Sequence, residues 1–195
     1  DVCSSDLLKG ERPLDTAECL SILQQLMVAG NQTTTHAIGE GMLLLIQNPE
    51  QLAKVQRRPE LVDDLVEEVL RLSTPTANMW RVATCDTNLS GVEISTGTML
   101  QVRYSSANRD DAQFDNGQVF DVTRDKINTQ IAFGYGVHMC IGASLARKEM
   151  QVAFRVLLER LTNFALDVDA NELNYPPNVL LRGLAALPIS FIART

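Results

Sequence analysis

Residues 133–142 gather three glycines, one histidine and one cysteine in the string FGYGVHMCIG. Glycine is entropically costly where a regular element would serve, so this density indicates a backbone that turns tightly and comes close to something flat. We expect Cys140 to begin a helix, where the dipole and the free N–H groups stabilise a thiolate. Such a thiolate suits an axial ligand of iron, and His138 could bond an acidic group on the same flat ligand. The alternative is a structural cysteine buried after a glycine turn.

A second group of interest is VAGNQTTT at residues 28–35, which falls inside a predicted helix. A glycine in a helix interior costs about 1 kcal/mol relative to alanine. Thr33 and Thr34 can bond back to helix carbonyls and bend the helix. Together these features could open a groove for a small ligand. The alternative is a packed helix whose glycine allows close contact with a neighbour.

A third group is the pair Glu68 and Arg71 in EEVLR at residues 67–71. Residues three apart share one face of a helix, so the two side chains can pair. Such pairs are common on solvated faces, and this one indicates little by itself.

Three helices are predicted to position the second and third groups. Asp15 and Glu18 form a capping-box pattern that opens the first helix. Apolar residues then recur at helical spacing, which predicts one helix of roughly 30 residues. Its inward stripe begins with Leu20, Leu23 and Met27. Prolines at 49 and 59 can open the second and third helices. The third stops before Thr74-Pro75.

The remaining segments are more varied. Residues 81–104 alternate in short runs, with turn signals at Ser90-Gly91 and Thr96-Gly97, and predict strands. Residues 105–132 are polar and weakly periodic, which indicates an ordered loop. Residues 140–161 are predicted as a helix, and the tail as two short strands. The fold class is mainly α with a small β-sheet. The residues expected on the inward face of the helix 140–161 are Leu145, Val152, Val156 and Leu157.

Bulk composition limits the functional class. The 195 residues suffice for one domain or a large piece of one. A net charge of −7 argues against a nucleic-acid binder, and no apolar run is long enough to span a membrane. The four cysteines form no CxxC pair, which favours a reducing cytoplasm over a disulfide framework. Residues 1–7 are unlike the rest and are interpreted as a non-native or disordered leader, so the domain runs over 8–195.

The string FGYGVHMCIGASLARKE resembles the signature of the cytochrome P-450 haem-thiolate monooxygenases, in their soluble bacterial type. Ala146, Arg147 and Glu149 extend the match, and the resemblance covers residues 8–195. It implies the C-terminal part of that fold: a long oxygen-binding helix, the following helices, a meander loop, and the cysteine-ligand loop with its helix. The residues that match in the loop itself are Phe133, Gly134, Gly136, His138, Cys140 and Gly142.

The resemblance implies a haem b cofactor and assigns residues to it. Cys140 would be the axial iron ligand, in a loop shaped by Phe133, Gly134, Gly136 and Gly142. Arg81 resembles the arginine that pairs with a haem propionate, and His138 would bind on the same side. The alternative for Arg81 is a solvated arginine at a strand end.

By the same resemblance, the middle of the long helix would form the oxygen-binding side of the site. Ala29 and Gly30 would face the haem, and Thr33 would hydrogen-bond dioxygen. The family usually has an acid before that threonine, whereas this chain has Gln32, which cannot ionise. Proton delivery would then use water held by Gln32, or another acid such as Glu40.

Other residues also take their roles from the resemblance. Thr76, Ala77 and Asn78 would line the substrate pocket. Glu68 and Arg71 would form a buried structural pair that bonds the meander loop. Its third partner is usually an arginine where this chain has Val119, so Arg109 or Arg124 must serve. Arg147 and Lys148 would either face an acidic electron donor or be solvated.

The function implied is insertion of one oxygen atom of O2 into a small hydrophobic substrate. Electrons would come from a ferredoxin-type donor with its NAD(P)H-dependent reductase. One alternative is a peroxide-using haem-thiolate peroxygenase, which Gln32 favours. The other is a truncated, non-catalytic chain that binds haem poorly and exposes the apolar stripe of its first helix.

Overall fold

One long helix runs through the molecule. The computed structural model describes residues 13–194, so the leader interpreted over residues 1–7 lies outside the described residues. Helix α1 spans Thr16–Gln47. The Asp15 side chain accepts from the Glu18 amide and the Glu18 side chain accepts from the Asp15 amide, both at 2.9 Å, so the predicted capping box is confirmed. Helix α2, Pro49–Arg57, starts at the predicted proline.

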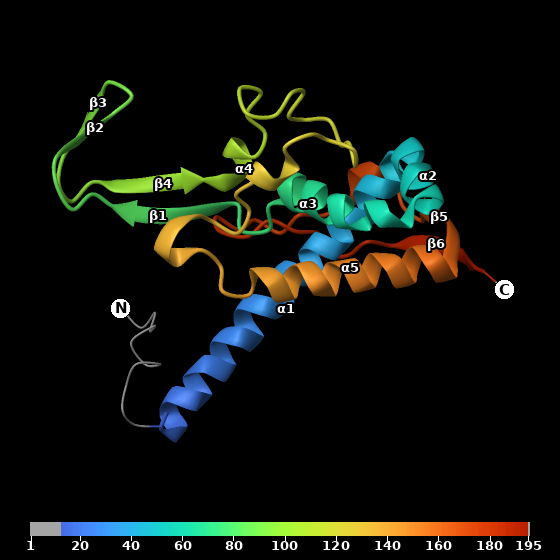
Figure 1. The fold of residues 1–195 in the computed structure, drawn as a ribbon, viewed down its shortest axis with the longest axis horizontal. Coiled ribbons are helices and arrows are strands. Elements are labelled where there is room, and N and C mark those ends of the chain that lie inside the picture. The colour runs from blue at the N-terminus through green and yellow to red at the C-terminus, as the bar shows by residue number, and fades with distance from the viewer. Residues whose placement is uncertain (1–12, 195) are drawn as a thin grey trace.

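Three helices enclose the core. A 3-10 turn at Pro59–Leu61 leads into α3, Val62–Ser73, and α5 spans Ala143–Arg160. The C-terminal half of α1 packs against α3 and α5 and crosses α5, while its N-terminal half projects beyond the rest of the chain (Figure 1). A side chain at Gly41 would overlap the ring of Phe154, so this glycine allows α1 and α5 to approach closely. The core includes Ala37, Met42, Leu45, Leu65, Val66, Val69, Met150 and Phe154.

The buried face of α5 differs from the prediction. Met150, Phe154 and Leu158 are buried at a spacing of four residues. Leu157 packs against the core as expected. The prediction was wrong for the other three inward residues, because these lie on the exposed face: Leu145, Val152 and Val156.

Strands form three separate two-stranded sheets rather than one small sheet. Strand β1, Asn78–Val82, pairs antiparallel with β4, Met99–Arg103. The hairpin of β2, Thr87–Leu89, and β3, Val92–Ile94, extends from their end (Figure 1). The turn that the sequence predicted at Ser90 and Gly91 is present, and both residues have positive φ.

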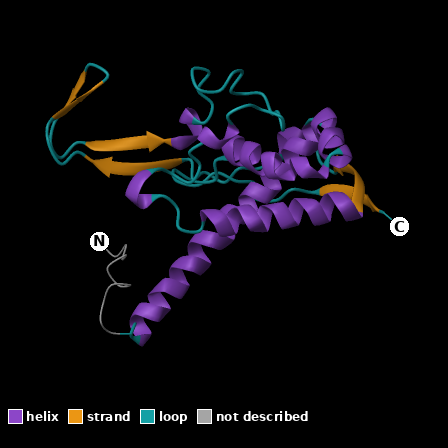
Figure 2. Cartoon of the chain, viewed as in Figure 1, coloured by secondary structure: helices purple, strands orange, loops and turns teal. Residues whose placement is uncertain are grey.

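The third sheet joins the end of α5 to the tail. Strand β5, Leu161–Leu166, follows α5 directly and pairs with β6, Ile189–Ala193. The sequence predicted two short strands in the tail, where the structure has one, β6, and an isolated β-bridge at Leu181, and it missed β5. Between β4 and α5, α4 at Tyr104–Ala107 leads into the predicted loop, which is anchored in the core by Phe120 and Val122. Helices gather on one side and β1 to β4 extend on the other (Figure 2).

Candidate functional site

The loop between residues 133 and 142 presents an exposed thiol. Gly134 and Gly136 have φ of 72° and 81°, which permits the tight turn expected of them. The Cys140 amide donates to the Phe133 carbonyl at 2.9 Å, which closes the turn. Cys140 is free and exposed. Helix α5 begins at Ala143 with Gly142 as its N-cap, three residues later than predicted.

His138 and Arg81 lie on one open hollow beside this loop. The hollow has a volume of about 350 Å³. The Arg81 guanidinium donates to the Trp80 carbonyl at 2.8 Å. The structure therefore brings together two cationic or hydrogen-bonding side chains that the sequence singled out separately. Trp80, Val82 and Met99 complete the wall of the hollow.

The α1 residues of the proposed oxygen-binding segment lie near the middle of the helix, where its exposed N-terminal part meets its packed C-terminal part. The Thr33 hydroxyl donates to the Ala29 carbonyl at 2.7 Å, the back bond that the sequence predicted. Ala29 and Gln32 are exposed, and a Cβ placed on Gly30 would meet nothing within 4 Å. Within the described residues, Gly30 therefore faces open space and has no packed neighbour.

Glu68 and Arg71 form a fully buried pair on α3. The Arg71 guanidinium makes two contacts of 2.8 Å with the Glu68 carboxylate. It also donates to the carbonyls of Asn108, Gly117 and Val119 in the loop after α4. These bonds tie the loop to α3.

Arg124 supplies the third side chain of this network. Its Nε lies 3.2 Å from Glu68 Oε1, and its Nη2 donates to the Val119 carbonyl at 2.7 Å. Arg109 instead donates to the Leu72 carbonyl at 2.6 Å and to Gln118. Of the two arginines that the sequence left open, the structure places Arg124 on Glu68.

Thr76, Ala77 and Asn78 lie against the tail. Thr76 forms a β-bridge with Leu181. The Ala77 amide donates to the Leu180 carbonyl at 2.8 Å, and the Asn78 side chain donates to the Val179 carbonyl at 2.9 Å. Residues about a hundred positions apart in the sequence are joined at this point.

A family model described as cytochrome P450 matches residues 4–188. The chain belongs to the cytochrome P450 family. The Bacillus subtilis (strain 168) protein named biotin biosynthesis cytochrome P450 is 40% identical over 189 residues, or 96% of this chain and 47% of the relative. The cytochrome P450 monooxygenase PikC of Streptomyces venezuelae is 41% identical over 177 residues, or 90% and 42%. The chain spans just under half the length of these relatives.

Solved P450 structures share this fold. The crystal structure of P450BioI with hexadec-9Z-enoic acid ligated acyl carrier protein has a TM-score of 0.87 and 41% identity, covering 95% of this chain and 47% of that one. The Bacillus subtilis P450 PksS has a TM-score of 0.87 and 38% identity, with 95% and 49% covered. The expected fold, a C-terminal portion of the P450 architecture, is confirmed.

P450 membership implies a haem iron, and the residues present fit that group. Cys140 offers an exposed thiol on a turn where Gly136 faces open space. Arg81 and His138 lie on one hollow beside it, where they suit acidic groups. Within residues 13–194, no three His, Cys, Asp or Glu side chains gather as a metal site of their own. Over the same range, no helix is long and apolar enough to cross a membrane.

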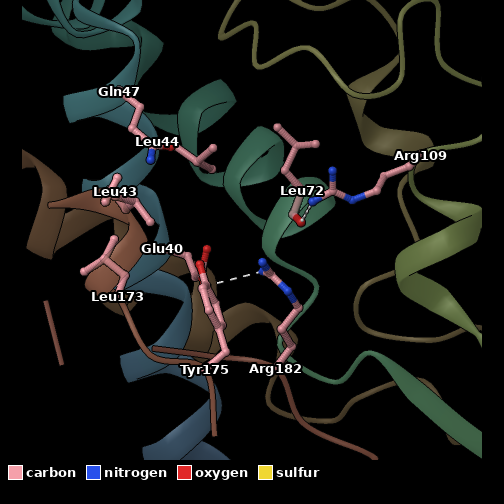
Figure 3. Close-up of a pocket in the computed structure, with 10 residues that line it drawn as sticks. Glu40, Leu43, Leu44, Gln47, Leu72, Arg109, Leu173, Tyr175 and Arg182 are labelled. Carbon is pink, nitrogen blue, oxygen red and sulfur yellow. Dashed lines mark hydrogen bonds and ion pairs between the residues drawn. The ribbon is translucent and has the colours of Figure 1, made fainter. Parts of the chain in front are cut away.

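A second pocket, of about 190 Å³, lies between α1 and the tail (Figure 3). Glu40 is buried in its wall, and its Oε1 lies 3.5 Å from Nη1 of Arg182. Burial, the charge of Glu40 and a hydrogen bond between the two side chains raise the pKa of Tyr175 to about 12. Burial and the charges of Arg182 and Arg71 lower the pKa of Arg109. Glu40 thus takes part in a polar cluster that the P450 motifs do not include.

Arg147 and Lys148 have different surroundings. Lys148 is exposed. Arg147 is half-buried, pairs with Glu67 on α3 and stacks on Phe133. No local pattern indicated Glu67, Tyr175 or Arg182, because their partners are distant along the chain and follow no local spacing.

Proposed function

We propose that the chain forms the C-terminal part of a haem-thiolate monooxygenase that inserts one oxygen atom of O2 into a small hydrophobic organic substrate. The observation that carries the proposal is the exposed Cys140 on its glycine turn, beside a hollow that holds Arg81 and His138. The cofactor would be haem b, with Cys140 as its ligand. Haem supplies O2 activation at its iron, and a thiolate ligand favours O–O cleavage.

The chain's own residues would bind and orient around that group. The Cys140 sulfur would donate electron density, and Arg81 and His138 would neutralise the propionates. Phe133, Gly134, Gly136 and Gly142 would shape the loop beneath the ring. The buried pair of Glu68 and Arg71 would keep this scaffold in place through the loop that follows α4.

The α1 segment would manage protons and the substrate side. Thr33 would hydrogen-bond dioxygen, next to Ala29 and Gly30. Gln32 is exposed and can hold water by hydrogen bonds without titrating. Thr76, Ala77 and Asn78 would contribute to the wall near the substrate. The partners would be a ferredoxin-type donor and its NAD(P)H-dependent reductase, in the cytoplasm, with no nucleic acid or membrane involved.

The test uses the full-length protein with haem, a ferredoxin, its reductase and NAD(P)H, and a panel of small hydrophobic compounds. A monooxygenase places one atom from labelled O2 in the product and requires both protein partners. Product that carries no label from O2 would contradict the proposal.

A second candidate function is a peroxygenase, which the uncharged Gln32 favours. In that case hydrogen peroxide supports product formation without the ferredoxin, and label from peroxide enters the product. Turnover with peroxide that exceeds partner-driven turnover would favour this candidate.

A further inference from the structure

The loop that carries Cys140 has few packing contacts of its own. Its apolar side chains point outward: Tyr135, Val137 and Ile141 are 87%, 96% and 98% exposed. Its closing bond is the one from the Cys140 amide to the Phe133 carbonyl. The position of the sulfur therefore depends on how the two flanks of the loop are held.

A single carboxylate on α3 contacts both flanks. Glu67 Oε1 and Oε2 accept from Nε and Nη2 of Arg147, at 2.5 and 3.1 Å. Oε2 also accepts from the side-chain amide of Gln130, at 2.9 Å. Gln130 lies just before the loop and Arg147 lies just after it, on α5. Glu67 thus joins the two ends of a segment that is otherwise exposed.

Both partners of Glu67 also contact the loop or the residues next to it, so their positions constrain its backbone. The Arg147 guanidinium carbon lies 4.7 Å from the centroid of the Phe133 ring. Phe133 is the residue whose carbonyl receives the Cys140 amide. The Gln130 side-chain oxygen accepts from the Ala132 amide at 2.7 Å, which fixes the backbone one residue earlier.

The chemistry of the contact suits a positioning role. A guanidinium that meets a carboxylate at two points is held in orientation as well as in place, and its bonds are charge-assisted. The side chains of Arg147 and Glu67 are 31% and 12% exposed, so the pair is only partly screened by solvent. The neighbouring Glu68 serves a different segment, the loop after α4.

We propose that Glu67 is a positioning residue for the Cys140 thiolate, acting through Arg147 and Gln130 on the two flanks of the loop. The inference rests on the proposed haem-thiolate function. Two adjacent carboxylates of α3 would then serve two different loops. Glu68 holds the loop after α4, and Glu67 holds the position and orientation of the loop that carries Cys140.

The test compares Glu67→Gln and Arg147→Met in the full-length, haem-loaded protein. The readout is the ratio of ferrous–CO haem with the red-shifted Soret band of thiolate ligation to haem without it. Loss of a hydrogen bond to a charged group is expected to lower this ratio about tenfold, equivalent to about 1.4 kcal/mol. Arg147→Lys keeps the charge and loses the two-point contact, so its ratio should fall between that of the wild type and that of Arg147→Met. It also decides the matter if Arg147→Met does not fold.

A matched control joins the same two helices. Arg155 on α5 pairs with Asp63 on α3 at 2.8 Å, and both side chains are exposed. Arg155→Met should keep the wild-type ratio, and the helical circular dichroism signal of both variants checks that they are folded.

The outcomes separate the inference from the function on which it rests. A wild-type protein without the thiolate band would overturn the proposed function, and the inference with it. A wild-type band that persists unchanged in Glu67→Gln, Arg147→Met and Arg147→Lys overturns the inference alone. An equal loss in Arg155→Met also overturns it, because the effect would then be general helix destabilisation.

Discussion

Cys19, Cys85 and Cys140 are all free and exposed, so exposure does not distinguish them. The backbone around Cys140 does: two glycines with positive φ precede it, and its amide is bound to Phe133. A turn of this kind places a thiol where a flat ligand can approach. The local pattern FGYGVHMCIG could be interpreted from the sequence because every residue involved lies within ten positions.

We predict that Cys140→Ala abolishes the red-shifted ferrous–CO Soret band of the full-length protein, because no other thiol stands on such a turn in the described part of the chain. The measurement is the reduced-CO difference spectrum. Cys85→Ala removes another exposed cysteine and should leave the band at wild-type intensity. Persistence of the band in Cys140→Ala would refute the ligand assignment.

Gln32 and Glu40 are the two residues considered for the proposed proton route, and their surroundings differ. Gln32 is exposed on the half of α1 that also carries Thr33. Glu40 is buried and ion-paired with Arg182, and its charge helps to raise the pKa of Tyr175. A carboxylate held in this way is poorly suited to exchange protons with the exposed segment.

We predict that Gln32→Glu increases product formed per reduced cofactor consumed in the full-length protein, because a carboxylate near Thr33 can take up and release protons near neutral pH. Thr33→Ala should divert electrons to peroxide, which is counted separately. Glu40→Gln should lower stability and leave coupling unaltered. Unchanged coupling in Gln32→Glu together with lost coupling in Glu40→Gln would reverse the assignment.

At the scale of elements, the sequence predicted helix existence better than helix orientation. Capping and proline signals placed α1 and α2 correctly, because these signals are local. Helix α5 carries two rows of apolar residues at helical spacing. One row is Leu145, Val152 and Val156, and the other is Met150, Phe154 and Leu158. Which row is buried depends on α1 and α3, which no local pattern encodes. For the same reason, the choice between Arg109 and Arg124 required the fold.

Helix α3 connects the core to the loop after α4 through Glu68. This carboxylate accepts from Arg71, from Arg124 and from the Asp121 amide, and is fully buried. We predict that Glu68→Ala leaves the Arg71 charge unpaired and lowers the free energy of unfolding by about 3–5 kcal/mol. The full-length protein should then be largely haem-free or insoluble.

The measurements for this prediction are haem content and urea unfolding. Glu60→Ala is the control, because Glu60 pairs with Arg58 at 3.9 Å with both side chains exposed. Exposed pairs contribute about 0–1 kcal/mol, so this variant should stay close to wild type. Normal haem content in Glu68→Ala, with a selective loss of turnover, would point to a catalytic role instead.

The contact between α1 and the tail should respond to alkaline pH. The pKa of Tyr175 is raised from 10.0 to about 12, first by burial and then by Glu40. A raised pKa contributes stability that is fully present below pH 10 and is lost as pH rises towards 12. We predict a fall in the free energy of unfolding over this interval that is smaller in Tyr175→Phe. Chemical denaturation at several pH values measures it, and identical slopes in both proteins would contradict the prediction.

At the scale of the whole molecule, apolar side chains are exposed on several segments, among them the projecting half of α1 and the cysteine loop. One half of α1 projects beyond the rest of the chain (Figure 1). Leu20, Leu23 and Met27 on this half are exposed, with Met27 at 74%. The cysteine loop exposes Tyr135, Val137 and Ile141. The sequence predicted that the α1 stripe faces inward in a complete protein and is exposed in a truncated chain, and its first residues are solvent-exposed in the described chain. Large exposed apolar patches mark interaction surfaces or aggregation liabilities.

The last prediction follows from these patches and concerns the 195-residue chain expressed by itself. Each fully buried large apolar side chain is worth about 1.5–3 kcal/mol relative to leaving it exposed, so the open stripe on α1 favours self-association. We predict that the chain is poorly soluble or binds haem weakly and does not hydroxylate a substrate. The double substitution Leu23→Gln and Met27→Gln should raise the soluble fraction several-fold, because it removes exposed apolar surface without disturbing the core. Leu45→Gln places an amide at a position that is 0% exposed, and should lower the soluble fraction instead. Soluble fraction after centrifugation and the monomer peak in size-exclusion chromatography measure both effects. A soluble, monomeric wild-type chain with stoichiometric haem and partner-driven turnover would contradict the prediction, because the exposed stripe would then not cause self-association.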